Sequence, residues 1–236
     1  MTTTMPVAVV TGAASGIGHA LAIQLADDGY VVHLADVAPT HDAAVEAGGT
    51  SHLLDVTDHE QVDRLATAVG HVDLVCLNAG IVGTSLGPPW EAPPDEWARL
   101  LNVNLLGVVN GLRSFVPKLL QSGGPAGILI TASLAGLLTF PGGGAYAATK
   151  HAVVAVAEQA ALALADTDVS VTLLCPALVR TAMSPVGDDP ADVAGLALSA
   201  VRSGRFLVVP DEWAGAIALR AERLLSGALP EMPAPE

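Results

Sequence analysis

Seven short runs of aliphatic and β-branched residues alternate with longer helical patterns along this chain. Each run is apolar at consecutive positions, which is typical of strands buried on both faces of a parallel sheet. Strands that alternate with helices indicate βα units and therefore a doubly wound α/β fold. The predicted strands are residues 7–10, 31–34, 51–54, 72–77, 127–131, 169–174 and 206–209. The predicted helices are residues 16–28, 58–69, 95–121, 145–165 and 190–203.

The sequence continues beyond the last predicted strand with a helical pattern at residues 211–226. Its apolar positions share one face, and they are Ala214, Ile217, Ala218, Ala221, Leu224 and Leu225. We see no linker or internal repeat, so we expect one domain over residues 1–236, with a C-terminal extension of about 211–236. The extra helix either packs on its own sheet, or covers a neighbouring subunit or the mouth of a substrate site.

The charge balance limits the possible partners. The chain has 24 acidic and 10 basic side chains, a formal net charge of −14. Nucleic acids and anionic membranes need a basic surface, so we expect neither as a partner. No run of about 18 uncharged apolar residues predicts a membrane span, and the N-terminal residues lack the basic region of a signal peptide. We therefore expect a cytoplasmic protein.

The two cysteines, Cys76 and Cys175, each lie at the end of an apolar run. This position favours two buried thiols over a disulfide, and their spacing matches no metal-binding motif. The sequence thus predicts no metal site.

A glycine-rich turn, TGAASGIG from Thr11 to Gly18, joins the first predicted strand to the first predicted helix. Gly12 permits the tight turn, Gly16 lets the backbone approach a pyrophosphate, and Gly18 allows close packing of the helix. The helix N-terminus adds free N–H groups and a partial positive charge. In this strand–turn–helix context the motif predicts a dinucleotide site.

Asp36 ends the second predicted strand, eighteen residues after Gly18. A carboxylate at this point can accept hydrogen bonds from a ribose and repels the 2′-phosphate of NADP. No arginine or lysine lies between Gly12 and Asp36 to neutralise that phosphate. The sequence therefore predicts NAD as the cofactor. The alternative interpretation is an aspartate that only caps the following loop.

Tyr146 and Lys150 lie four residues apart in a predicted helix, so both side chains share one face. A positive charge ~5 Å from the phenol, at an effective dielectric constant of ~20, lowers its pKa by about two units from ~10. The phenol then suits general acid–base catalysis. Ser133, thirteen residues upstream, can stabilise negative charge on a substrate oxygen, although a serine that ends a strand is usually a cap.

These motifs together make the chain similar to the short-chain dehydrogenase/reductase family from about Val7 to Val209. The resemblance implies a Rossmann-type fold and a catalytic set in which Tyr146 is the acid–base and Lys150 holds the ribose. It further implies that Asn104 positions a water that links Lys150 to solvent, and that Ser133 completes the set. The implied cofactor-binding residues are Thr11, Gly12, Ser15, Gly16, Ile17, Gly18, Asp36, Asp55, Val56, Asn78, Ala79, Gly80, Tyr146, Lys150, Pro176, Val179 and Thr181.

The chain departs from the family pattern in two places before the added helix. Ala177 follows Pro176 where the family usually has glycine. The resemblance implies that the segment with Pro176 and Thr181 holds the nicotinamide, so the added β-carbon is expected to shift the backbone there. Residues 176–206 contain one helical pattern, which predicts a shortened substrate lid.

The candidate substrate contacts are mostly aliphatic, and no basic residue stands among them because we expect Arg180 to point outward. They are Trp90, Leu134, Leu137, Leu138, Phe140, Leu178 and Met183. The sequence therefore predicts an oxidoreductase that transfers a hydride between NAD(H) and a neutral, largely apolar secondary alcohol or ketone. Two alternatives stay open. One is a 3-oxoacyl-carrier-protein-type reductase, and the other is a non-catalytic NAD-binding regulatory subunit.

The predicted helix at 145–165 is apolar nearly all round, so it must be buried on more than its sheet-facing side. We expect a homodimer or homotetramer that forms through the helices near 95–121 and 145–165. The alternative is that the helix is buried within its own domain.

Overall fold

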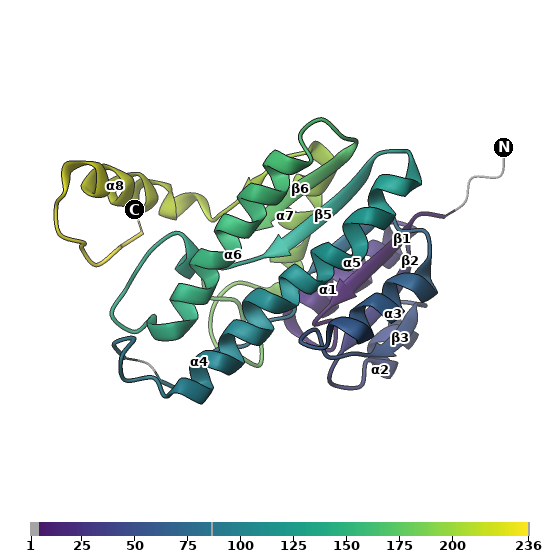
Figure 1. Ribbon diagram of the computed structural model, residues 1–236, viewed down its shortest axis with the longest axis horizontal. Coiled ribbons are helices and arrows are strands. Elements are labelled where there is room, and N and C mark those ends of the chain that lie inside the picture. The colour runs from purple at the N-terminus through teal and green to yellow at the C-terminus, as the bar shows by residue number, and fades with distance from the viewer. Residues whose placement is uncertain (1–4, 86, 236) are drawn as a thin grey trace.

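The computed structural model describes residues 5–85 and 87–235 (Figure 1). Seven parallel strands form one sheet in the order β3-β2-β1-β4-β5-β6-β7. All seven predicted strands are confirmed, with ends that differ by no more than two residues. The strands are β1 (Val7–Thr11), β2 (Val31–Asp36), β3 (Thr50–Leu53), β4 (Leu74–Leu77), β5 (Ala126–Thr131), β6 (Val169–Leu174) and β7 (Leu207–Val208).

The helices also follow the sequence pattern, with two differences. The six-residue helix α2 was not predicted, because it is too short to show a helical period. The predicted helix at 95–121 is interrupted by a π-helical segment, Leu101–Leu106. The helices are α1 (Gly16–Asp27), α2 (His41–Glu46), α3 (His59–Val69), α4 (Pro94–Leu100), α5 (Gly107–Ser122), α6 (Gly144–Ala163), α7 (Pro190–Ser203) and α8 (Ala214–Ser226).

The helices cover both faces of the sheet because successive strand residues point in opposite directions. In β1, Val9 packs into the cluster that includes α3, α5 and α6. Its neighbour Val10 packs into the cluster that includes α1 and α7. Both side chains are fully buried. The continuous apolarity of the strands is therefore explained by a core on each side, and the doubly wound α/β fold is confirmed.

The strand order reverses between β1 and β4, which are direct neighbours in the sheet. At such a reversal the connections leave in opposite directions, and a crevice opens at the carboxyl ends of the strands. Thr11, Asp36 and Thr131 end their strands at this edge. The topology thus collects the predicted cofactor residues from distant parts of the chain.

Helix α8 forms as predicted, but it projects away from the sheet (Figure 1). None of its thirteen residues is buried, and the side chain of Leu225 is 91% exposed. Packing on its own sheet, the first of the two expected positions, is therefore wrong. A side-chain contact joins it to α6, where Arg220 Nη2 lies 3.3 Å from His151 Nε2.

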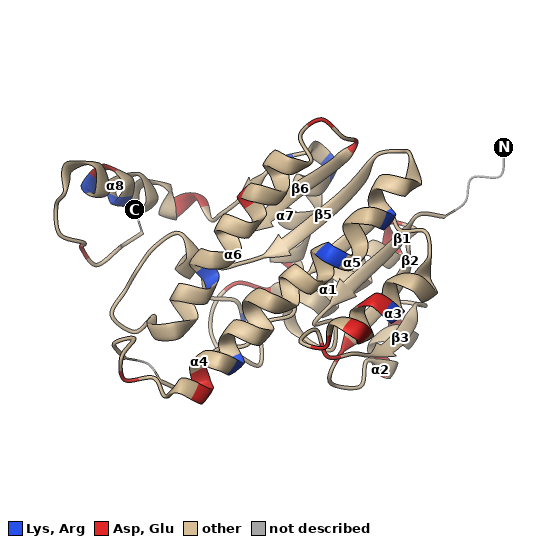
Figure 2. Ribbon diagram, in the orientation of Figure 1, with Lys and Arg blue, Asp and Glu red and all other residues tan. Residues whose placement is uncertain are grey.

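Acidic residues are grouped on α3 and α4, whereas α6 carries few charged residues (Figure 2). Among the described residues, no helix has the length and apolarity that a membrane span requires.

Candidate active site

The glycine turn is locked between two other loops. Gly12 and Gly16 have φ values of +68° and +57°, a region that glycine adopts without strain. A Cβ at Gly12 would lie 2.7 Å from Ala79 Cα, and a Cβ at Gly16 would lie 2.8 Å from Thr181 Cγ2. Only a residue without a side chain fits at either point, so the turn closes tightly against the segments that follow β4 and β6.

Thr11 fastens β1 to β4 at the crevice. Its hydroxyl oxygen accepts hydrogen bonds from the backbone N–H of Asn78 (3.0 Å) and of Ala79 (3.2 Å). In return, Asn78 Nδ2 donates to the Thr11 carbonyl at 3.2 Å. Thr11 is buried and does not line the cavity. Its side chain therefore holds the two strands in register rather than presenting a group to a ligand.

The Asp36 carboxylate accepts hydrogen bonds from two backbone N–H groups. Oδ2 accepts from Ala14 at 3.0 Å, which ties the end of β2 to the glycine turn. Oδ1 accepts from Ala38 at 2.9 Å, so Asp36 also caps the next loop, as the alternative interpretation held. Each carboxylate oxygen can accept a second bond. Because Asp36 also lines the cavity, capping the loop does not exclude contact with a ribose.

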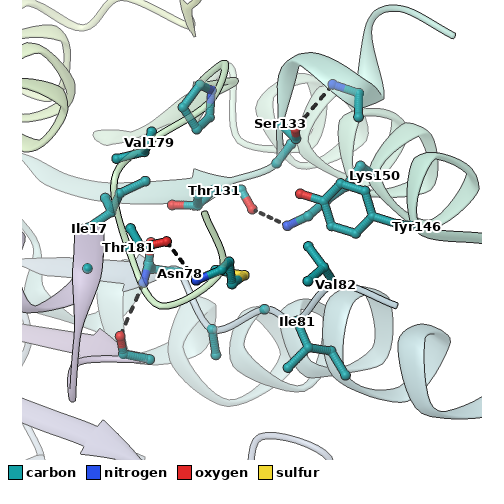
Figure 3. Close-up of a pocket in the computed structure, with 18 of the residues that line it drawn as sticks. Ile17, Asn78, Ile81, Val82, Thr131, Ser133, Tyr146, Lys150, Val179 and Thr181 are labelled. Atoms are coloured by element: carbon teal, nitrogen blue, oxygen red, sulfur yellow. Dashed lines mark hydrogen bonds between the residues drawn. The ribbon is translucent and has the colours of Figure 1, made fainter. Parts of the chain in front are cut away.

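A cavity of about 1060 Å³ runs along the carboxyl ends of the strands (Figure 3). It extends from the glycine turn to the Tyr146–Lys150 pair, so the predicted cofactor site and the predicted catalytic residues line one cavity. Every predicted catalytic and cofactor residue lines it except Thr11, Gly18 and Asn104. A Cβ at Gly18 would overlap the Gly12 carbonyl, so Gly18 shapes the turn from behind.

Tyr146, Lys150 and Ser133 meet in this cavity (Figure 3). The helix α6 carries Tyr146 and Lys150 on one face, and the Lys150 Nζ lies 5.7 Å from the centre of the Tyr146 ring. Nζ donates to the carbonyl of Thr131 at 3.2 Å, which fixes it over the end of β5. Ser133 follows on the same strand end, and its Oγ accepts from the Ala135 N–H at 3.1 Å.

Burial dominates the acid–base properties of this pair. It lowers the pKa of Lys150 from its ordinary value of 10.5 to about 8. It also raises the pKa of Tyr146, and a hydrogen bond with Ser133 works in the opposite direction. The expectation that Lys150 brings the Tyr146 pKa down by about two units is therefore wrong for the protein alone. The reason is that a low-dielectric site disfavours the charged form of both groups.

Asn104 lies in the π-helical segment and is completely buried. Its Oδ1 accepts from the Ile81 N–H at 2.8 Å, and its Nδ2 donates to the Ile81 carbonyl (2.9 Å) and the Thr149 hydroxyl (3.1 Å). Asn104 therefore joins the loop after β4 to the helix that carries Tyr146. A Cβ at Gly80 would lie 3.3 Å from Lys150 Nζ and 3.4 Å from Asn104 Oδ1, so these two polar atoms lie close to the same point.

A family model described as short chain dehydrogenase matches residues 6–190. The chain belongs to the short-chain dehydrogenase family. The 1-deoxy-11-beta-hydroxypentalenate dehydrogenase of Streptomyces exfoliatus is 42% identical over 221 residues, which cover 84% of this chain and 80% of the relative.

Two further relatives agree with this assignment. The 3beta-hydroxysteroid dehydrogenase 2 of Eggerthella lenta is 35% identical over 185 residues, 74% of this chain and 71% of the relative. A crystal structure of a short-chain dehydrogenase/reductase from Burkholderia phymatum, in complex with NAD, superposes with a TM-score of 0.87. It is 32% identical, and the match covers 98% of each chain.

The substrate half of this short-chain dehydrogenase agrees in part with the sequence prediction. Five of the seven candidate substrate contacts line the cavity, and they are Leu134, Leu138, Phe140, Leu178 and Met183. Leu137 does not; it packs against the core that α5 and α6 share. Residues 176–206 contain one helix, α7, as predicted, and Arg180 pairs with Asp189 on the surface as expected.

The prediction that Trp90 contacts substrate is wrong. Its side chain is 81% exposed and lies outside the cavity. The loop is held instead by Trp97, whose Nε1 donates to the Pro89 carbonyl at 3.1 Å. An aromatic residue in a proline-rich loop gave no signal for the direction in which it points.

Several residues of the cavity escaped the sequence analysis. Trp213, Met232 and Pro233 reach it from the C-terminal extension, and Arg99 reaches it from α4. Thr131 also lines it, and the buried Thr131 hydroxyl has no hydrogen-bond partner among the described residues. Of these residues, only Thr131 could have been predicted from the sequence, because it ends a strand at the edge where the site lies. The positions of the others depend on how distant segments pack.

Proposed function

We propose that this short-chain dehydrogenase is an NAD-dependent oxidoreductase that interconverts a neutral, largely apolar secondary alcohol and the corresponding ketone. The observation that carries the proposal is the meeting of Tyr146, Lys150 and Ser133 in the cavity that begins at the glycine turn. Hydride transfer coupled to proton transfer requires acid–base groups next to a dinucleotide-binding site, and this cavity contains both.

The residues present fit a nicotinamide dinucleotide. The tight turn at Gly12 and Gly16 leaves no room for a Cβ, and the helix α1 begins at Gly16, so backbone N–H groups face a pyrophosphate. Asp36 lines the cavity with acceptor capacity for a ribose. Farther along, the unpartnered hydroxyl of Thr131 offers a buried polar group that a ligand would satisfy.

The preference for NAD over NADP follows from charge. Asp36 repels a 2′-phosphate, and residues 12–36 contain no arginine or lysine to offset it. The one arginine among the described lining residues is Arg99. It lies near the C-terminal end of α4, on a different segment from the glycine turn and from Asp36.

When bound, NADH supplies the hydride, and NAD⁺ accepts it in the reverse direction. Tyr146 gives its phenolic proton to the carbonyl oxygen as that oxygen gains negative charge. Ser133 donates a hydrogen bond to the same oxygen. The ammonium of Lys150 faces the phenol and favours its ionised form after the proton has left.

The proton on Tyr146 must then be replaced. Lys150 Nζ and Asn104 Oδ1 lie near one point beside Gly80, which supports the predicted role of Asn104 as a residue that positions a water next to Lys150. Asn104 does so without reaching the substrate, because its amide is held by Ile81 and Thr149. We therefore assign Asn104 as a positioning residue.

The apolar character of the substrate follows from the walls around Tyr146. The walls present aliphatic surface from Leu134, Leu138, Leu178 and Met183. Covering this surface with apolar groups of a substrate favours binding. The dehydrogenases of hydroxypentalenate and of 3beta-hydroxysteroids are among the relatives, and a secondary alcohol on a ring system is consistent with both names.

The test is the consumption of NADH with a panel of cyclic and open-chain apolar ketones. We expect turnover with NADH, a clear preference over NADPH, and a loss of at least about 100-fold in kcat for Tyr146→Phe, since a positioned acid–base group contributes about 10²–10⁴-fold. Tyr30→Phe is the matched control, because Tyr30 is the only other tyrosine and lies outside the cavity.

Three outcomes contradict the proposal. Activity that survives Tyr146→Phe would exclude Tyr146 as the acid. NADH binding without turnover of any ketone, or turnover only with acyl-carrier-protein-linked 3-oxo chains and NADPH, would favour the regulatory subunit or the acyl-chain reductase instead.

A further inference from the structure

Three residues of the C-terminal extension line the active-site cavity. Trp213 precedes α8, and Met232 and Pro233 lie in the tail that follows it. In sequence, Trp213 and Met232 are separated by the whole of α8, yet both lie at the same cavity. The tail must therefore turn back after α8, and Figure 1 shows it curving beneath that helix.

The turn back begins at Gly227. This residue has a φ of +71°, and it ends α8 in the left-handed conformation that glycine favours. The Ala228 N–H donates to the Arg223 carbonyl at 3.0 Å, and the Gly227 N–H donates to the Leu224 carbonyl at 3.3 Å. The chain direction is thus reversed within two residues of the end of the helix.

One side chain then holds the returning tail. Arg223 Nε donates to the Leu229 carbonyl at 3.1 Å, and its Nη2 forms an ion pair with the Glu231 carboxylate. We call these contacts the Arg223 clasp. Glu231 directly precedes Met232 and Pro233, so the clasp fixes the tail at the residue before it enters the cavity wall.

Apolar packing contributes little to the position of the tail. None of the thirteen residues in α8 is buried, and the side chains of Leu224, Leu225 and Leu229 are exposed. The tail is therefore held by polar contacts, and Arg223 supplies two of them. Loss of the clasp is expected to release Met232 and Pro233 without disturbing the sheet or the glycine turn.

We propose that Trp213, Met232 and Pro233 form an apolar outer wall of the substrate site, which the Arg223 clasp holds in place and which selects bulky ring-containing ketones and alcohols. Met183 and Phe140 line the same cavity from other loops and add further apolar surface. We expect a small ketone next to Tyr146 to leave the outer wall uncovered, and a fused-ring ketone to extend along the cavity towards it. The inference rests on the proposed function and names its substrate class.

The experiment measures binding rather than turnover. Decalone, a fused-ring ketone, and cyclopentanone, a small one, are titrated into the NAD⁺-loaded protein by calorimetry. No reaction occurs, because NAD⁺ and a ketone are both oxidised. For Arg223→Ala and for Glu231→Gln we expect Kd for decalone to rise about tenfold. We expect Kd for cyclopentanone and for NAD⁺ to stay within about twofold.

The matched control is Glu222→Gln, which removes an exposed carboxylate from the same helix. It should leave all three dissociation constants unchanged. The double variant Arg223→Glu with Glu231→Arg restores an ion pair with reversed charges, and it should recover most of the decalone affinity. If the single variants weakened binding only by disturbing the fold, the double variant would not recover this affinity.

An unchanged Kd for decalone in both clasp variants would overturn the inference. An equal loss for decalone and cyclopentanone would also overturn it, since the tail would then affect the whole site. Wild-type protein that binds cyclopentanone but not decalone excludes the bulky substrate class. The proposed function stands or falls separately, on NADH consumption and the Tyr146→Phe variant.

Discussion

Lys150 is a charged residue in the protein interior, and its burial works against stability. Its side chain is only 4% exposed, and its pKa is lowered from 10.5 to about 8. Between these two pH values the unfolded chain binds more protons than the folded one. The free energy of unfolding therefore rises as the pH rises from about 8 to 10.5, and the full penalty applies below about pH 8.

We expect Lys150→Met to stabilise the protein at pH 7 and to abolish turnover. A shift of about 2.5 units, at about 1.36 kcal/mol per unit, corresponds to about 3 kcal/mol. Loss of the hydrogen bond from Lys150 to Thr131 lowers the free energy of unfolding by about 1 kcal/mol. The net increase in the free energy of unfolding is therefore about 2 kcal/mol. The gain should shrink towards pH 10. Urea unfolding of the ligand-free protein at both pH values measures it.

Lys118→Met is the matched control for this prediction, because Lys118 is the only other lysine and is partly exposed on α5. Its substitution should change the stability by less than about 0.5 kcal/mol at either pH. Equal stabilities of Lys150→Met and wild type at pH 7 would mean that the ammonium is solvated in solution.

At the scale of elements, the π-helical segment between α4 and α5 links three parts of the site. Its wider turn presents Asn104 inward, where the side chain meets the loop after β4 and the helix α6. Such irregular turns are frequent at functional sites. The helical pattern of residues 95–121 does not predict the π-helical segment. The segment depends on the hydrogen bonds that Asn104 forms with distant residues.

Asn104→Ala should destabilise the protein by about 2–4 kcal/mol, since it removes three hydrogen bonds of a fully buried side chain, two of them to the half-buried backbone of Ile81. It should also lower kcat. Asn102→Ala, an exposed position in the same segment, should change the stability by less than about 0.5 kcal/mol. Chemical denaturation and steady-state kinetics on both variants provide the measurement. A stable but inactive Asn104→Ala would show that Asn104 acts on the reaction alone.

At the scale of the whole molecule, association through α5 and α6 stays a prediction. On the inner face of α6, Val153, Val154 and Ala157 are buried, so part of the apolar surface of this helix is covered within the subunit. The outer face still exposes Ala155 and Leu162, the latter at 78%. Small residues on an exposed helix face let a second helix approach closely, and α6 carries few charges to oppose this (Figure 2).

Light scattering should give two or four times the subunit mass of 23.8 kDa. Ala155→Arg should yield a monomer, because it places a long charged side chain at the predicted contact. Val45→Arg, an exposed position on α2, should leave the mass unchanged. A wild-type monomer, or an Ala155→Arg variant that still associates, would remove these helices as the interface.

The sequence by itself determined the strands, the order of the βα units and the local motifs. Patterns such as TGAASGIG and the Tyr146–Lys150 spacing depend on neighbours within a turn or two, where backbone geometry decides which side chains share a face. Tertiary structure decided what distant segments do together. The wrong direction of Trp90, the raised pKa of Tyr146 and the return of Met232 to the cavity depend on burial and on contacts such as the Arg223 clasp. These arise only when parts of the chain that are far apart in sequence pack against one another.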